Sequence, residues 1–110
     1  GTIAPTADFS LVERAVAEAR KKDIPVKVGN ILSSDTFYSA DAAANDAWKA
    51  MGVLCVEMEA AALYLNAAYA KKKALCLLTI SDHLYTGEAL SAQERQTSFH
   101  EMMEIALKIA

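Results

Sequence analysis

The chain has 110 residues, of which 54% are hydrophobic and 23% charged, and its formal net charge is −3. This length predicts one domain with a hydrophobic core, and the mixed charges, without a basic stripe, argue against a nucleic-acid surface. The longest uncharged run, residues 60–70, is too short and too rich in alanine to span a bilayer. The opening residues, GTIAPTADF, lack the basic and apolar regions of a signal peptide.

The first predicted element is a helix over residues 10–22, because its apolar residues recur at helical spacing along one face. Ser10 and Glu13 have the spacing of a capping box at the start of this helix. Pro25 follows the helix, and residues 26–34, VKVGNILSS, then predict a strand.

The middle of the chain predicts two more helices, separated by a short strand. Residues 39–52 predict a helix with Gly52 just beyond its C-cap. Residues 53–58, VLCVEM, predict a short buried strand. An alanine-rich helix is then expected from about Glu59 to Ala70.

The last third of the chain predicts a strand, a loop and a helix. Residues 73–81, KALCLLTIS, are apolar on both faces and therefore predict a buried strand. Residues 83–90 predict a loop. Ser91 and Glu94 form a second capping box, which predicts the start of one C-terminal helix.

Strands that alternate with helices predict an α/β layered fold. Ligands in such folds bind at the C-terminal ends of the strands. Two polar clusters occupy those positions, residues 57–59 after VLCV and residues 81–83 after ALCLLTI. We therefore expect Glu57 and Glu59 to lie close to Asp82 across one pocket.

Glu57 and Glu59 are the only charged residues between Lys49 and Lys71. A carboxylate in so apolar a segment is costly unless it is paired or hydrogen-bonded. One interpretation is structural: Glu59 would favour the first turn of a helix, and Glu57 would accept hydrogen bonds from backbone amides. The other is functional: a carboxylate here would accept hydrogen bonds from a cis-diol such as the 2′,3′ pair of ribose.

Asp82 ends the third predicted strand and precedes a loop. It is either a turn or cap aspartate, or a general acid whose pKa is raised by apolar neighbours. Arg95, one turn into the last helix, would ordinarily be a solvated surface residue. His83 and His100 match no metal spacing, and we expect both to be structural or surface residues.

Cys55 and Cys76 each lie inside an apolar run, and neither belongs to a Cys-x-x-Cys or Cys/His pattern typical of zinc. We expect two reduced, buried thiols, as in a cytosolic protein, and no metal site.

Four blocks occur in order along the chain: VGNILSSDTFY, GVLCVEMEAAALY, LLTISDHLYTGE and ERQTSFHEMMEIAL. Together they resemble the bacterial purine nucleoside phosphorylases of the hexameric, nucleoside phosphorylase-I type, over residues 5–110. VEMEAA alone would not separate these enzymes from the related nucleosidases, whereas SDH followed by ERQTSF does. The resemblance implies a layered αβα fold with a mixed central sheet, of the phosphorylase/hydrolase type, of which residues 1–110 are the C-terminal half.

The resemblance also implies roles for residues of the substrate pocket. Phe37 is expected to pack against the purine. Val56, Glu57 and Met58 are expected to line the pocket for base and sugar. Glu59 is expected to accept hydrogen bonds from the ribose hydroxyls.

By the same resemblance, Asp82, beside Ser81, is expected to face the purine N7, and Arg95 to help Asp82 donate its proton. The implied reaction is phosphorolysis of a purine (deoxy)ribonucleoside to the free base and (deoxy)ribose 1-phosphate. Protonation of N7 makes the purine a neutral leaving group, and phosphate captures the oxocarbenium-like sugar carbon. Such a pentosyltransferase (a glycosyltransferase of purine salvage) needs phosphate as co-substrate and no cofactor. The sequence does not indicate a preference between 6-amino and 6-oxo purines, and because an acid at Asp82 could donate to N7 of both, we expect both to be substrates.

One departure from the family pattern concerns phosphate. The family's subunit is longer, and its phosphate-binding glycine and arginines lie in an N-terminal half that this sequence lacks. The chain is therefore expected to carry the base, ribose and acid groups, and to form a homo-oligomer, a hexamer in the family, together with that half. Two alternatives stay open: a nucleosidase, in which water replaces phosphate, and a nucleoside-binding or assembly module that is inactive alone. Cys55 also stands where the family is expected to have a smaller residue.

Overall fold

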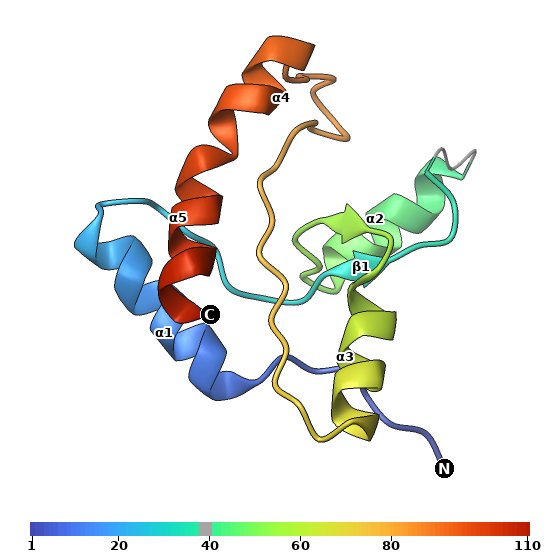
Figure 1. Ribbon diagram of the computed structural model, residues 1–110. Coiled ribbons are helices and arrows are strands. Elements are labelled where there is room, and N and C mark those ends of the chain that lie inside the picture. Colours follow the sequence, from blue (N-terminus) through green and yellow to red (C-terminus); the bar gives the residue numbers. More distant parts are fainter. Residues whose placement is uncertain (38–40) are drawn as a thin grey trace. The chain divides into compact units, whose positions relative to one another are not determined.

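The computed structural model describes residues 1–37 and 41–110 (Figure 1). The elements in chain order are α1 (Phe9–Lys21), β1 (Leu32–Ser33), α2 (Ala42–Ala50), β2 (Val56–Glu57), α3 (Ala60–Tyr69), α4 (Ala92–Ser98) and α5 (His100–Ile109). They fall into two compact units. We call Gly1–Asp8 with Lys27–Ala74 the strand unit, and Phe9–Val26 with Leu75–Ala110 the helical unit. Helices with a small parallel sheet agree with the predicted α/β class.

The two strands of the strand unit form a parallel pair. Leu32 pairs with Val56, and Ser33 pairs with Glu57. A helix follows each strand, as parallel pairing through crossover connections favours (Figure 1). The ladder bonds run from Leu54 N–H to Asn30 O (2.9 Å), from Leu32 N–H to Cys55 O (2.9 Å) and from Ser34 N–H to Glu57 O (2.8 Å).

Both strands are much shorter than the sequence predicts. The strands expected over residues 26–34 and 53–58 shrink to two residues each. The second is also not buried, since Leu54, Val56 and Met58 expose 47%, 41% and 42% of their surface. Strand length and burial depend on neighbouring segments, and none of the described residues extends the ladder or covers this face.

α2 begins and ends with recognisable caps. The Asp41 side chain accepts the N–H groups of Ala43 (3.1 Å) and Ala44 (3.3 Å), which satisfies donors that lack partners within the helix. Gly52 has a φ of 79°, a left-handed conformation that confirms its predicted position after the C-cap. The predicted start of this helix at residues 39–40 lies outside the described residues.

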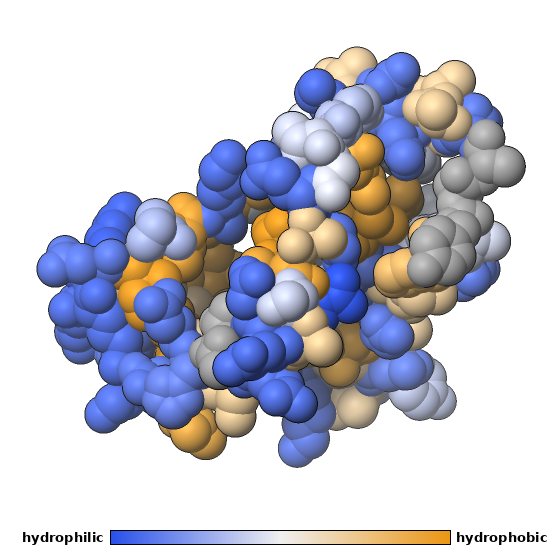
Figure 2. Space-filling model, turned by 90° about the horizontal axis from the view of Figure 1, so that it is seen from above, coloured by the Kyte–Doolittle hydropathy of each residue, from blue (hydrophilic) through white to orange (hydrophobic). Residues whose placement is uncertain are grey.

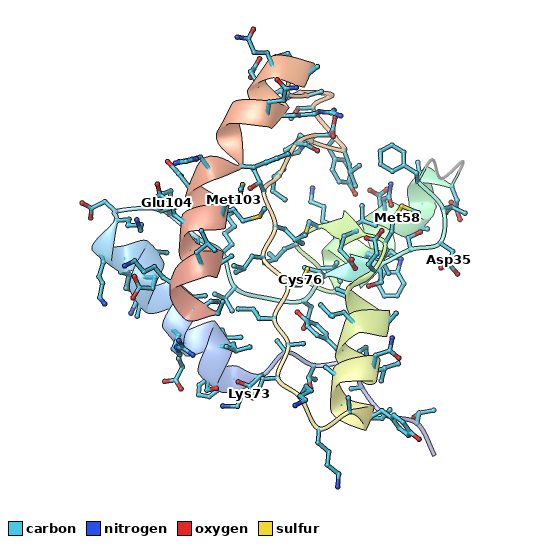
Figure 3. The ribbon with its side chains drawn as sticks, in the orientation of Figure 1. Asp35, Met58, Lys73, Cys76, Met103 and Glu104 are labelled. Carbon is cyan, nitrogen blue, oxygen red and sulfur yellow. The ribbon has the colours of Figure 1, made fainter. Side chains whose placement is uncertain are left out.

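α1 and α5 lie side by side in the helical unit and form its core (Figure 1). Ala15, Ala19, Ile105 and Ile109 are buried between them, and Ile24, Leu75 and Leu77 pack against this cluster. Lys22 Nζ, just after α1, forms an ion pair with Glu104 Oε2 at 2.7 Å. Figure 3 shows Glu104 on the side of α5 that faces the end of α1.

α1 starts at Phe9, one residue earlier than predicted. Ser10 therefore lies inside the first turn, and the capping box predicted for Ser10 and Glu13 is wrong. The position before the helix belongs instead to Asp8, and aspartate is as favourable there as serine.

The strongest strand prediction, residues 73–81, is also wrong. Residues 75–81 have no strand partner among the described residues of the helical unit (Figure 1). Its side chains nevertheless alternate as in a strand: Leu75 and Leu77 pack on the helical core, while Leu78 and Ile80 are exposed by 42% and 58%. The prediction of burial on both faces is therefore wrong as well, because pairing and burial both need neighbouring segments that the sequence pattern does not contain.

The predicted C-terminal helix is two helices. Ser91 caps α4, its Oγ accepting the N–H of Glu94 at 3.1 Å, which confirms the predicted N-cap. The helical pattern is interrupted at Phe99, whose ψ of −6° departs from the value of about −42° in a regular helix. Across residues 1–37 and 41–110, the structure contains no helix with the length and apolarity that crossing a bilayer would need.

Large apolar side chains remain exposed in both units. Figure 2 shows apolar residues open to solvent among polar ones on the face that it presents. In α3, Leu63, Leu65 and Tyr69 are exposed, and Ala60 at its start is buried. The segment 53–65, expected to be the most core-like of the chain, is therefore largely uncovered in this structure.

Candidate active site

Glu57 ends β2 with both carboxylate oxygens engaged. Its Oε1 accepts a hydrogen bond from the Ser33 hydroxyl on β1. Its Oε2 accepts the backbone N–H groups of Glu59 (2.6 Å) and Ala60 (2.6 Å) at the start of α3. The Ser33 Oγ in turn accepts the N–H of Ala61 at 2.9 Å. The structural interpretation of Glu57, a carboxylate bound to backbone amides, is therefore confirmed.

These contacts change the acidity of Glu57. Partial burial acts to raise its pKa, but hydrogen bonds from Ser33 and from the amides of Glu59, Ala60 and Met58 outweigh it. The pKa of Glu57 is consequently lower than its ordinary value of 4.5. Glu57 is thus an anion at neutral pH, and its charge lies at a helix N-terminus, where anions are favoured.

Glu59 differs from Glu57 in its exposure and in its hydrogen bonding. It occupies the N-cap position of α3, yet its side chain makes no capping hydrogen bond. It is exposed, and among the described residues its carboxylate has no hydrogen-bond or ion-pair partner. Glu59 therefore keeps its acceptor oxygens available for a ligand.

Apolar residues lie close to these glutamates in the sequence. Val56 and Met58 flank Glu57 and are both exposed; Met58 is labelled in Figure 3. Phe37, the residue expected to stack on a purine, is 72% exposed. All three belong to the strand unit, so apolar surface and an open carboxylate occur in the same unit.

Neither cysteine forms a disulfide within residues 1–37 and 41–110, and both are half-buried. This confirms two reduced thiols, although neither is fully buried as expected. Burial, and to a lesser extent the negative charge of Glu57, raises the pKa of the Cys55 thiol. A protonated thiol is a poor nucleophile, so Cys55 is chemically quiet beside Glu57.

Asp82 is held from two sides in the helical unit. Its Oδ2 accepts a hydrogen bond from the Ser81 hydroxyl at 2.5 Å. Its Oδ1 lies 3.0 Å from the Arg95 guanidinium of α4. The Asp82 and Arg95 side chains are 41% and 46% exposed, so the pair remains accessible from solvent. The structure therefore brings together three residues predicted for the site.

A compact loop fixes the backbone around Asp82. An antiparallel bridge joins Asp82 to Ala89, and Gly87 turns the loop with a φ of 74°. His83 organises the turn, because its Nδ1 accepts the N–H groups of Tyr85 (3.2 Å) and Thr86 (3.1 Å). His83 is thus a structural residue, as expected, but its specific part in shaping this loop was missed. The sequence signal that could have indicated this role is a histidine two and three residues before the turn residues Tyr85 and Thr86, whose N–H groups it accepts.

Other titratable groups lie outside the predicted site. Glu104 accepts from Lys22 and lies 3.1 Å from His100, and the hydrogen bond and charge of Lys22 lower the pKa of Glu104. A shallow groove is lined by Lys22, Glu104, Leu107 and Lys108, none of which was predicted to act. No group of three or more His, Cys, Asp or Glu that could hold a metal ion occurs within residues 1–37 and 41–110.

The fold and these residues agree with what comparison with known proteins shows. The family model described as the phosphorylase superfamily matches residues 2–110, and the chain belongs to that superfamily. The purine nucleoside phosphorylase DeoD-type of Aliivibrio salmonicida is 51% identical over 107 residues, which are 97% of this chain and 45% of the relative. The DeoD-type 2 enzyme of Vibrio parahaemolyticus is 50% identical, and the DeoD-type enzyme of an Exiguobacterium is 51% identical, with the same coverage.

The chain therefore spans less than half the length of these relatives and corresponds to their C-terminal part. Predicted site residues occur in both units: Glu57 and Glu59 in the strand unit, and Ser81, Asp82 and Arg95 in the helical unit. The expectation that both groups line one pocket stays a prediction.

Proposed function

We propose that this chain supplies the base, sugar and acid groups of an enzyme that phosphorolyses purine (deoxy)ribonucleosides to the free base and (deoxy)ribose 1-phosphate. The observation that carries this proposal is the identity of about half of the aligned residues to enzymes named purine nucleoside phosphorylase. The contact between Asp82 and Arg95 supports it, because the guanidinium would stabilise the carboxylate that Asp82 becomes once it has given up its proton.

In the proposed reaction Asp82 donates a proton to N7 of the purine while the bond to the sugar breaks. General acids of this kind typically contribute about 10²–10⁴-fold to the rate. The Arg95 guanidinium, 3.0 Å away, then stabilises the carboxylate that forms. Ser81, donating to the other oxygen, keeps the carboxyl group oriented.

Glu59 is the proposed ligand of the sugar. Its open acceptor oxygens suit the two neighbouring hydroxyls of ribose, which are neutral donors. Phe37, Val56 and Met58 would supply apolar contact to the base and sugar. Glu57, whose oxygens are already occupied, is a weaker candidate for direct contact with the substrate.

The phosphate site is proposed to come from the part of the relatives that this chain does not span. Phosphate needs arginines or a nest of backbone amides to leave water. Of the arginines here, Arg95 is paired with Asp82, and Arg14 and Arg20 lie on α1. The reaction needs no cofactor in this scheme, since protonation and phosphate attack complete it.

The same missing part is proposed to complete the fold. A layered αβα arrangement with a mixed central sheet would give residues 74–80 the strand partners that they lack here and would cover the exposed side chains of Leu78 and Ile80. We also propose a hexamer, as the family resemblance implies. A place in the cytoplasm is supported by the two cysteines, which form no disulfide among the described residues and so suit a reducing compartment.

Two other functions are distinguishable from this one. In a nucleosidase, water would attack the sugar in place of phosphate. In a binding or assembly module, nucleoside would bind without any turnover. The relatives' names favour the phosphorylase over both.

The test is a chimera in which the preceding part of the A. salmonicida relative is joined to this chain. We expect release of hypoxanthine from inosine, and of adenine from adenosine, that depends on phosphate. Release without phosphate would indicate a nucleosidase. Binding without release in either condition would indicate a binding module.

A further inference from the structure

Glu57 is placed by the register of the small sheet. Ser33 pairs with Glu57 across β1 and β2, and paired residues of neighbouring strands point to the same face. The Ser33 hydroxyl therefore reaches Glu57 Oε1 directly. A shift of one residue in either strand would send one of the two side chains to the opposite face.

The other oxygen of Glu57 replaces the cap that α3 lacks. The first N–H groups of a helix have no partner within the helix, and Glu59 at the N-cap position makes no side-chain cap. Glu57 Oε2 accepts two of these N–H groups, at 2.6 Å each. Ser33 Oγ accepts the next one, that of Ala61, at 2.9 Å. Three consecutive amides are thus bound by two side chains from the strand ends.

This arrangement has a consequence for Glu59. Its backbone N–H is anchored to Glu57, which fixes where the residue sits at the strand-to-helix junction. Its side chain is relieved of capping and stays exposed without a partner among the described residues. Glu57 therefore determines the position of a carboxylate whose own acceptors are open.

We propose that Glu57 is a positioning residue, which acts through the Glu59 backbone to place the Glu59 carboxylate against the sugar, and does not itself bind the sugar. That the ligand is a sugar rests on the proposed function, whereas the positioning of Glu59 rests on the hydrogen-bond geometry. It differs from the expectation that Glu57 lines the pocket as a ligand. The Ser33 hydroxyl and the two α3 amides already use three of the about four acceptor positions of the carboxylate. Two sugar hydroxyls could therefore both bind Glu57 only if one of these donors lost its acceptor, which would be costly.

The first test is a double-mutant cycle in the chimera, with variants Glu57→Ala, Glu59→Gln and both together. We expect Glu57→Ala to lower kcat/KM for inosine about 10- to 100-fold, the size of a lost charged hydrogen-bond network. Because Glu57 acts through Glu59, the double variant should lose no more than about twofold beyond Glu59→Gln alone. The Kd for free hypoxanthine, measured by calorimetry, should stay unchanged in all three.

Two milder variants guard against a general folding defect. Glu57→Gln keeps one acceptor oxygen for the two amides and should recover most of the activity. Ser33→Ala removes the hydrogen bond from β1 to Glu57. It should lower kcat/KM for inosine by less than Glu57→Ala does, and it should leave the Kd for hypoxanthine unchanged. Multiplicative losses in the double variant would overturn the proposal, because they would show that Glu57 contacts the substrate independently. Equal weakening of hypoxanthine and inosine would overturn it too.

A second measurement separates this inference from the proposed function. In the chimera without any substrate present, hydrogen exchange at the Glu59 and Ala60 amides should be slow and should become faster in Glu57→Ala. If the chimera shows no turnover but these amides behave as expected, the phosphorylase proposal fails and the positioning of Glu59 stands. If the amides exchange equally fast with and without Glu57, the positioning inference fails whatever the activity.

Discussion

Glu57 and Glu59, two residues apart at the end of β2, hold their carboxylates in different surroundings. Glu57 is half-buried and accepts hydrogen bonds from a hydroxyl and two amides, whereas Glu59 is exposed and open. The sequence indicates that two carboxylates in an apolar segment need hydrogen-bond or ion-pair partners. It does not indicate that Glu57 finds its partners within the protein while Glu59 stays open, because this difference depends on Ser33, which lies 24 residues from Glu57.

The acidity of Glu57 leads to a prediction about stability. Because its pKa is lowered in the folded state, Glu57 stabilises the fold fully above the unfolded value near 4.5, and this contribution is lost as pH falls through the lowered pKa. We expect the free energy of unfolding of the chimera, measured in urea, to fall between pH 6 and pH 3.

The matched control for this prediction is Glu57→Gln, which cannot titrate. Its loss of stability over the same pH range should be smaller than that of the unmodified protein. Glu104, whose pKa is also lowered, titrates in both proteins and so cancels in the comparison. Identical pH dependence in the two proteins would contradict the network seen around Glu57.

Asp82 carries the prediction about chemistry. In the chimera we expect Asp82→Asn to lower kcat for inosine by about 10²–10⁴-fold, because an amide cannot give its proton to N7. The KM should change much less, since the amide keeps the size of the carboxyl group and can still contact Ser81. Steady-state kinetics with inosine and phosphate make the measurement, and full turnover by the Asn variant would mean that Asp82 is not the acid.

At the scale of elements, the loop from Asp82 to Ala89 depends on His83. Its Nδ1 accepts two backbone N–H groups, so we expect His83→Ala to cost about 0.5–1.5 kcal/mol of stability and to speed hydrogen exchange at Tyr85 and Thr86. His83→Asn should behave nearly as the unmodified protein, because an asparagine oxygen can accept from the same amides.

The control for this loop is His100→Ala on α5, since His100 contacts Glu104 and not the loop. It should leave exchange at Tyr85 and Thr86 unchanged. If His83→Asn is as disruptive as His83→Ala, an acceptor atom is not what the loop needs, and the account of His83 is wrong.

Helices proved easier to predict from this sequence than strands, and the reason is physical. The bonds of α2 and the caps at Asp41, Gly52 and Ser91 are local, so a short stretch of sequence contains them. A strand needs a partner from elsewhere in the chain. Residues 73–81, predicted as a buried strand, therefore form no ladder among the described residues, and β1 and β2 shrink to the residues that pair.

The site was predicted unevenly for a related reason. Residue patterns pointed to Glu57, Glu59 and Asp82, because acids at strand ends are conspicuous. The contact of Arg95 with Asp82 came from family resemblance, since the residues are 13 positions apart and nothing in their spacing requires it. The role of His83 was missed, because it depends on the direction of one ring nitrogen.

For the whole molecule, the exposed apolar surface is the main observation. Val56, Met58, Leu78 and Ile80 are all exposed, and the chain spans 45% of the length of the A. salmonicida relative. Exposed apolar surface and unpaired strand-like segments promote association. Purified alone, the 110-residue chain should aggregate or bind the preceding part of the relative, as light scattering with and without that part would show. A monodisperse chain indifferent to it would contradict this view.

Following phosphate shows whether this chain completes a phosphorylase only together with the preceding part of the relative. Inosine and phosphate are incubated with this chain alone, with the preceding part of the relative alone, and with the chimera, and products are followed by phosphorus NMR. Because phosphate must be held in line with the sugar carbon, we predict a ribose 1-phosphate signal with the chimera and none with either part alone. A ribose 1-phosphate signal from the lone chain would contradict the account, and so would release of hypoxanthine by the chimera without any ribose 1-phosphate.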